Sequence, residues 1–123
     1  MPTTLAIVVA GALGVLARYL AQNAIGVHGR FPWATFVVNV SGAFAAGLLL
    51  TVIGRRFSLP MWIQSAVFVG FLGGYTTFSA MTLDTYALIE RGQFGVAGAY
   101  AVGSLTGGLV AVLAGVLTGR AIV

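Results

Sequence analysis

The chain has 123 residues, of which 59% are hydrophobic and only 7% are charged, and its mean hydropathy is +1.05. So apolar a composition excludes an ordinary soluble domain. The absence of Cys and the single His exclude disulfides, thiol chemistry and a transition-metal cluster. The net charge of +4 comes from scattered arginines that form no basic patch, so we expect no nucleic-acid binding.

Four membrane spans are expected in a single all-α domain, residues 1–123. Three charge-free stretches, 31–54, 57–83 and 92–119, each exceed the roughly 20 residues that a spanning helix needs. An earlier span continues past Arg18, whose long side chain can reach the interface, and it lacks the basic start of a signal peptide. The expected spans are residues 5–24, 33–53, 61–89 and 94–118.

The basic residues are all arginines, and they divide evenly between the two membrane sides of a four-span chain. One side carries Arg55, Arg56 and Arg120, and the other carries Arg18, Arg30 and Arg91. Because the Lys/Arg bias orients a membrane protein, this tie predicts copies inserted both ways and paired as an antiparallel homodimer. Such a pair would generate the inverted repeat that many transporters contain. Chance in a small count is the alternative.

The second span contains Asn39, a carboxamide in the middle of a charge-free segment. A polar group in hydrocarbon must find hydrogen-bond partners. Asn39 therefore either joins helices to one another or offers N–H donors to a permeating ion.

The third span is irregular. Residues 70–84 read Gly-Phe-Leu-Gly-Gly-Tyr-Thr-Thr-Phe-Ser-Ala-Met-Thr-Leu-Asp, and the paired glycines and clustered hydroxyls predict a break at 73–76. Irregular backbone at membrane depth is tolerated only where protein or a water-filled path satisfies it. The first half-helix would end in carbonyls that suit a small cation, and the second would begin with N–H groups that suit an anion.

The fourth span has two rows of small or polar residues. One row suits tight helix packing and is a candidate subunit interface; it consists of Gly103, Gly107, Ala111, Gly115 and Gly119. The other row, Tyr100, Ser104 and Gly108, is rotated from the first by about 100°. Tyr100 and Ser104 are therefore candidates either for helix packing or for a polar track.

The polar groups favour an anion over a proton or a cation. No carboxylate lies in the first two spans, and Asp84 and Glu90 lie at and after the end of the third. A proton-coupled exporter needs an ionisable group inside the membrane. The remaining groups are donors, and the edge of Phe78 adds weak positive potential. The donors are Asn39, Ser41, Thr76, Thr77, Ser79, Tyr100 and Ser104.

Three segments of the chain resemble the Fluc/CrcB family of small dual-topology fluoride channels. They are Gly-Ala-Leu-Gly-Val-Leu-Ala-Arg-Tyr in the first span, Thr-Phe-Val-Val-Asn-Val-Ser-Gly-Ala-Phe in the second and Gly-Phe-Leu-Gly-Gly-Tyr-Thr-Thr-Phe-Ser in the third. The resemblance implies an antiparallel homodimer with two narrow fluoride pathways. It also implies a structural sodium ion at the dimer centre, held by the backbone carbonyls of Gly73 and Thr76.

The resemblance places pore residues at Asn39, Phe78, Tyr100 and Ser104. With the neighbouring polar and apolar groups, the expected fluoride pathway comprises Asn39, Phe78, Thr77, Ser79, Met81, Tyr100 and Ser104. Met81 stands where the family commonly has a second Phe, and Gly108 stands where it has a third hydroxyl. Arg18 and Asp84 also match family positions or segments, but we assign them no role from the sequence.

We therefore expect a channel that exports cytoplasmic fluoride passively across the plasma (inner) membrane of a microbe and confers fluoride resistance, and not an enzyme. Its expected partners are the fluoride ion, the lipid bilayer and a second copy of the chain. Two alternatives stay open. One is a proton-coupled exporter of the small multidrug or guanidinium type, and the other is a non-transporting membrane assembly subunit.

Overall fold

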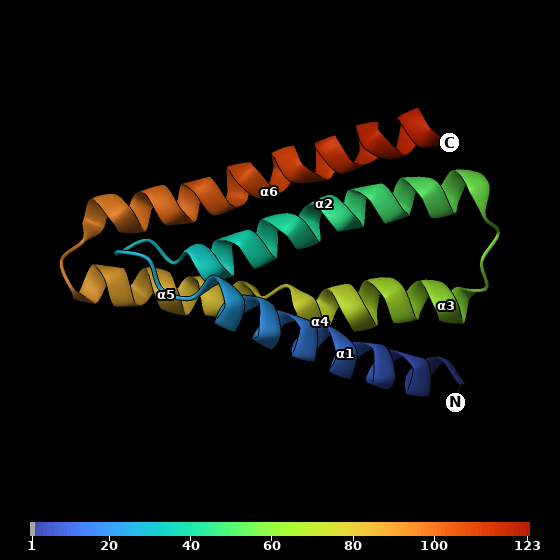
Figure 1. The fold of residues 1–123 in the computed structure, drawn as a ribbon, viewed down its shortest axis with the longest axis horizontal. Coiled ribbons are helices and arrows are strands. Elements are labelled where there is room, and N and C mark those ends of the chain that lie inside the picture. Colours follow the sequence, from blue (N-terminus) through green and yellow to red (C-terminus); the bar gives the residue numbers. More distant parts are fainter. Residues whose placement is uncertain (1) are drawn as a thin grey trace.

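The computed structural model describes residues 2–123, and within them every regular element is helical (Figure 1). Four helical units are long and apolar enough to cross a membrane, at Pro2–Ile25, Trp33–Arg56, Met61–Glu90 and Phe94–Ile122. Each extends the expected span by one to four residues at one or both ends. The expected all-α, four-span membrane fold is confirmed.

Three spans are single helices, whereas the third is assembled from several segments. The single helices are α1 (Pro2–Ile25), α2 (Trp33–Arg56) and α6 (Phe94–Ile122). The third span consists of α3 (Met61–Ser65), the π-helix η1 (Ala66–Leu72), α4 (Gly73–Tyr75) and α5 (Phe78–Glu90).

The interruption of the third span lies at Thr76 and Thr77, slightly later than the 73–76 that the glycines indicated. Thr76 and Thr77 have extended backbones, with φ/ψ of −89°/152° and −147°/113°, while Gly73–Tyr75 remains helical. The paired glycines therefore do not themselves break the helix. Both lie in its last turn, where Gly74 allows a close approach to α1.

The helices pack through glycines that let backbones touch. A Cβ built on Gly47 of α2 would lie 2.2 Å from the Val112 carbonyl oxygen of α6, and one on Gly115 would lie 2.2 Å from the Phe44 carbonyl oxygen. Gly119 likewise faces Thr51. The small-residue row of the fourth span therefore packs on α2 of the same chain. Our expectation that it could form a subunit interface was wrong, because α2 already covers it.

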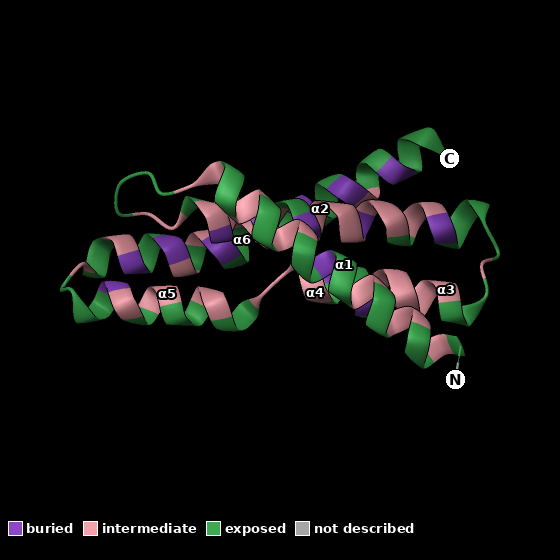
Figure 2. Cartoon of the chain, turned by 60° about the horizontal axis from the view of Figure 1, so that its bottom comes forward, coloured by how far each residue is buried: buried purple, intermediate pink, exposed green. Residues whose placement is uncertain are grey.

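A second close contact joins α1 to the third span just before its interruption. A Cβ on Gly14 would lie 2.1 Å from the Phe71 carbonyl oxygen, and one on Gly74 would lie 2.6 Å from the Gly11 carbonyl oxygen. Gly14 is the one buried residue of α1, and most of that helix is exposed (Figure 2). Thus α1 is a peripheral helix that braces the irregular segment.

The two chain ends and the α2–α3 loop lie at one end of the bundle, and the other two loops lie at the opposite end (Figure 1). At that opposite end, Leu88, Ala97 and Tyr100 form a buried cluster, and Tyr100 is 0% exposed. The ring of Phe31, from the first loop, meets the ring of Tyr100 edge-on at a centroid distance of 5.4 Å. This cluster fixes α5 against α6 and so positions the far side of the interruption.

Candidate functional site

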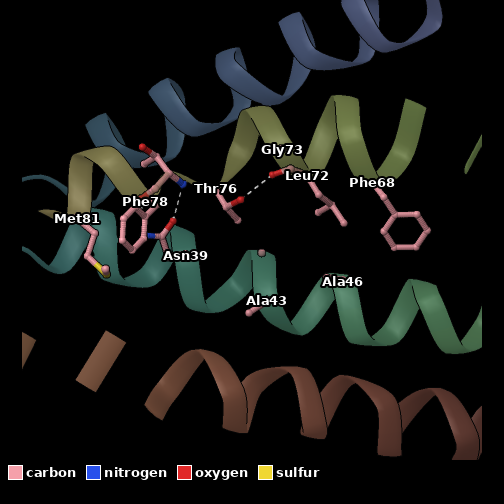
Figure 3. A pocket seen from close by; sticks show the side chains of 11 residues that line it. Asn39, Ala43, Ala46, Phe68, Leu72, Gly73, Thr76, Phe78 and Met81 are labelled. Atoms are coloured by element: carbon pink, nitrogen blue, oxygen red, sulfur yellow. Dashed lines mark hydrogen bonds between the residues drawn. The ribbon is translucent and has the colours of Figure 1, made fainter. Parts of the chain in front are cut away.

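A cavity of about 410 Å³ lies beside the interruption, between α2 and the third span (Figure 3). Asn39 of α2 faces the third span there, and Phe78 and Met81 reach the cavity from α5. None of the residues that line it is acidic or basic. The cavity brings together six of the residues expected from the sequence: Asn39, Gly73, Thr76, Thr77, Phe78 and Met81.

Asn39 holds the interrupted backbone through a pair of hydrogen bonds. The Thr77 N–H donates to Asn39 Oδ1 at 2.8 Å, and Asn39 Nδ2 donates to the Thr77 carbonyl at 3.1 Å. The amide thus pairs with an extended residue much as a neighbouring strand would. An amide nitrogen carries two hydrogens, so one N–H of Asn39 stays available. Joining helices and donating to a ligand are therefore compatible roles for this residue.

Arg18 supports the interruption from the other side. Its Nε donates to the Gly74 carbonyl oxygen at 3.1 Å, and the side chain is half-buried. Arg18 precedes the end of α1 at Ile25 by seven residues, or about 10 Å of helix. The guanidinium is therefore not simply a loop charge that reaches the interface, because it satisfies a carbonyl of the irregular segment.

The carbonyls of Gly73 and Thr76 have lost their helical partners. In an unbroken helix the Thr77 N–H would reach the Gly73 carbonyl, but it donates to Asn39 instead. The Ala80 N–H would reach the Thr76 carbonyl, but it donates to Thr77 Oγ1 at 3.1 Å. Unpaired backbone carbonyls in hydrocarbon need a partner. This oxygen-only donor set fits a hard monovalent or divalent cation, which oxygen ligands suit.

Several of the expected donor hydroxyls are committed within the chain. Ser41 Oγ donates to the Val38 carbonyl at 3.0 Å, and Thr76 Oγ1 donates to the Leu72 carbonyl at 2.8 Å. The Tyr100 hydroxyl donates to Asp84 Oδ2 at 3.0 Å. A hydroxyl has one proton, so these three groups offer an additional ligand only acceptor lone pairs in this arrangement.

Two further hydroxyl protons remain available: that of Ser104, and one of the two in the Thr77–Ser79 pair, whose hydroxyls share a single hydrogen bond. Ser104 Oγ is buried and has no hydrogen-bond partner among residues 2–123. Thr77 and Ser79 hydroxyls lie 3.4 Å apart, and Thr77 Oγ1 caps α5 by accepting from Ala80. A buried hydroxyl without a partner is costly, so Ser104 is the clearest candidate for binding something that the chain itself does not supply. Ser79, Tyr100 and Ser104 lie outside the cavity lining.

Asp84 gains a structural role that the sequence did not reveal. Its carboxylate accepts the hydrogen bond of the fully buried Tyr100 hydroxyl, and so links α5 to α6. The phenol partly satisfies a carboxylate in a sparsely polar region, where an unpaired charge would be expensive. The acidic group therefore orients Tyr100.

Phe78 and Met81 occupy different environments although both line the cavity. Phe78 is 75% exposed, so its ring lies at the open surface of the four-helix unit. Met81 is half-buried and packs on the cluster that contains Leu88 and Tyr100. Its flexible thioether fills the irregular space between that cluster and the cavity.

Sequence reasoning missed the α2 wall of the cavity, which Gly42, Ala43 and Ala46 form. A Cβ on Gly42 would lie 2.3 Å from Thr76 Cγ2, so this glycine makes room for the interruption. Helical spacing from Asn39 could have found the wall, since residues three, four and seven positions later share its face. Phe68 and Leu72, which line the other side, gave no comparable signal.

Replacing Asn39 by Ala should destabilise the interruption, because it leaves the half-buried N–H and carbonyl of Thr77 without partners. Each unsatisfied group costs roughly 1–3 kcal/mol. We expect a lower unfolding midpoint in detergent and faster amide hydrogen exchange at Thr77. Asn23→Ala, at an exposed position of α1, is the matched control and should change neither. Unaltered exchange at Thr77 in Asn39→Ala would show that the pair of hydrogen bonds is unimportant.

Comparison with known proteins places the chain in a family. The family model described as CrcB-like protein, Camphor Resistance (CrcB), matches residues 5–116. A protein of Solibacter usitatus named "Fluoride-specific ion channel FluC" is 47% identical over 118 residues, which cover 94% of this chain and 97% of the relative.

Other bacterial relatives carry the same name. That of Nitrobacter winogradskyi is 42% identical over 120 residues, covering 96% of this chain and 95% of the relative, and that of Rhizobium leguminosarum bv. trifolii is 41% identical over 124 residues, covering 99% of each. Four spanning helices and bacterial relatives of full length indicate a multi-pass protein of a microbial plasma membrane. The chain belongs to the CrcB family.

Proposed function

We propose that this chain is a fluoride-selective channel that lets cytoplasmic fluoride leave the cell passively. The family is one of ion channels, and the chain is not an enzyme. The observation that carries the proposal is the uncharged cavity beside the interruption, into which Asn39 brings an amide that keeps one free N–H. A fixed donor without a nearby carboxylate favours a small anion over a cation.

The groups around the interruption can replace part of the hydration shell of fluoride. Asn39, Ser104 and one hydroxyl of the hydrogen-bonded Thr77–Ser79 pair retain protons for an anion, and filters generally substitute protein groups for water in this way. The N-terminus of α5 adds partial positive charge next to Phe78. Phe78 and Met81 would form the apolar wall that narrows the path.

The Tyr100 hydroxyl would contribute differently from Ser104. Its proton is held by Asp84, so it can donate to fluoride only after that hydrogen bond opens. Tyr100 would therefore take part through its ring edge or after a local rearrangement, whereas Ser104 has no internal hydrogen bond to break before it donates. In the proposed polar track of α6, the Tyr100 proton is therefore already used in a hydrogen bond, whereas the Ser104 proton is not.

Passive export follows from the direction of the driving force. Fluoride that enters an acidified cell as neutral HF dissociates and is trapped as the anion. An inside-negative potential then favours its exit by about 2.3 kcal/mol per charge for each 100 mV. A selective channel is sufficient, and no ionisable side chain of the cavity is required for proton coupling.

Fluoride efflux from liposomes, followed with a fluoride electrode, tests the function. Asn39→Asp should abolish efflux, because a carboxylate places negative charge in the anion path. Ser104→Ala should slow efflux about tenfold, the value of one hydrogen bond of about 1.4 kcal/mol. Ser41→Ala is the matched control, since its proton is committed to Val38, and it should conduct nearly as the unmodified chain does.

The same assay separates the alternatives. A proton-coupled exporter would move guanidinium-like cations when a pH gradient is applied and would not release fluoride. A non-transporting subunit would show no flux when reconstituted alone. Equal efflux from Asn39→Asp and the unmodified chain would remove Asn39 from the pathway.

We further propose a structural sodium ion held by the carbonyls of Gly73 and Thr76. The fit rests on the loss of both carbonyls' helical N–H partners to Asn39 and Thr77. A cation would supply the positive charge that satisfies these oxygens and favours a nearby anion. Within the chain, Asn39 and Arg18 hold the surrounding backbone so that these carbonyls stay outside a regular helix.

Sodium should raise the melting temperature of the purified protein relative to an equal concentration of N-methylglucamine. Thr76→Ser should retain this effect, because the ligand is a backbone carbonyl that the substitution leaves in place. Identical melting in both salts, together with a refined crystal structure lacking density beside these carbonyls, would refute the site.

We also propose that two copies pair antiparallel with mixed orientation in the membrane. Phe78 is 75% exposed, and the unpaired carbonyls lie at the depth of the interruption, where lipid could not satisfy them. A second copy could cover both. With Arg18 bonded at the interruption, the loops and ends carry three arginines on one side and two on the other, so the orientation signal stays weak.

The absence of Cys makes this arrangement directly testable. His28→Cys and Ser58→Cys place single exposed thiols in the first and second loops, at opposite ends of the bundle. A membrane-impermeant maleimide applied outside should label about half of each variant, because both orientations are expected. Complete labelling of one variant and none of the other would establish a single orientation and contradict the proposal.

A further inference from the structure

A second cavity, of about 350 Å³, lies at the end of the bundle that carries the first and third loops. Its walls come from residues 26–32, the start of α2, the last turns of α5 and the turn before α6. The helices end here (Figure 1), so the cavity lies at the level of the lipid headgroups. Trp33, which is 44% exposed, lines it and has the side chain that membrane interfaces favour.

The cavity combines groups of opposite character. Arg30 and Arg91 line it, and their guanidinium groups can bind a phosphate through several N–H donors. Asp84 also lines it, with Oδ2 accepting from Tyr100 and Oδ1 left for another donor. These are the three charged residues of its wall among residues 2–123.

An unsatisfied acceptor completes the site. Gln93 Oε1 is buried and has no hydrogen-bond partner among residues 2–123, although Gln93 lines the cavity. A buried carbonyl oxygen without a donor is destabilising. The Gln93 oxygen and the Asp84 carboxylate can therefore each accept a hydrogen bond from an N–H donor. Arg30 and Arg91 can bind an anion.

We propose that this cavity binds the headgroup of an ethanolamine phospholipid. The phosphate would lie against Arg30 and Arg91, and the primary ammonium would donate to Asp84 and, once the Gln93 side chain turns toward the cavity, to Gln93 Oε1. A simple anion would leave the Gln93 oxygen unsatisfied, and a simple cation would meet two guanidinium groups. A choline headgroup has the same charges but no N–H donor, so it cannot satisfy the Gln93 oxygen.

The lipid-binding proposal can be tested separately from fluoride conduction. The groups that would select the lipid, Gln93, Arg30 and Arg91, lie outside the proposed fluoride pathway. The site gives the end of the bundle that carries the first and third loops a specific lipid contact. The arginines of the opposite end, Arg55, Arg56 and Arg120, are all exposed. A lipid that binds only the folded chain would stabilise it by mass action.

Native mass spectrometry of the full chain tests the proposal. The protein is released from vesicles of equal parts phosphatidylethanolamine, phosphatidylcholine and phosphatidylglycerol with identical acyl chains. We expect phosphatidylethanolamine to be retained about five to ten times more than either of the others, as one additional net hydrogen bond predicts. Successive N-methylation of the ethanolamine should reduce its retention stepwise.

Variants identify the contacts. Gln93→Leu should reduce retention of phosphatidylethanolamine to that of phosphatidylcholine, and Gln93→Glu, which keeps the acceptor, should preserve it. Arg91→Gln should weaken all three lipids, whereas Arg120→Gln, at the opposite end, should weaken none. Melting temperatures with and without lipid verify that each variant is folded.

Two results would overturn the proposal. Equal retention of phosphatidylglycerol and phosphatidylethanolamine would reduce the cavity to a phosphate site without an ammonium contact. Unchanged selectivity in folded Gln93→Leu would mean that water, rather than a lipid ammonium, satisfies the Gln93 oxygen.

Discussion

The pair of hydrogen bonds between Asn39 and Thr77 is the interaction on which the rest of the structure depends. It lets one residue of the third span be extended within a spanning unit, where water cannot satisfy the backbone. Once the Thr77 N–H is taken by Asn39, the Gly73 carbonyl has no helical partner. The unpaired Gly73 carbonyl follows from that diversion, and the cap that Thr77 Oγ1 provides to the Ala80 N–H then begins α5 and leaves the Thr76 carbonyl unpaired.

The sequence was sufficient to predict the parts of the fold that depend on hydropathy. The four spans follow from charge-free stretches, and each observed span begins and ends within four residues of the expected bounds. The break was expected from its glycines and hydroxyls but lies at Thr76 and Thr77. Composition indicates that a helix is weak. Which residue departs from helical geometry depends on its hydrogen-bond partner, Asn39, which is distant in sequence.

Residue type also could not distinguish a free hydroxyl from a committed one. Ser41 and Ser104 are chemically identical, yet one donates to Val38 and the other has no partner among residues 2–123. Asp84 was unexplained for the same reason, because its role depends on the tertiary contact with Tyr100. The small-residue row of α6 was misinterpreted because a close helix contact looks the same in sequence whether its partner is α2 or a second chain.

Arg18 shows how one such contact changes a conclusion drawn from counting. A guanidinium inside a span needs an acceptor, and the Gly74 carbonyl at the end of a half-helix needs a donor. Their hydrogen bond offsets both costs at once. The same contact removes Arg18 from the loop charges, so the even division of arginines becomes three against two. Because Arg18 stabilises the interruption, it does not also act as an orientation signal. The difference in arginine count between the two membrane sides is then a single residue.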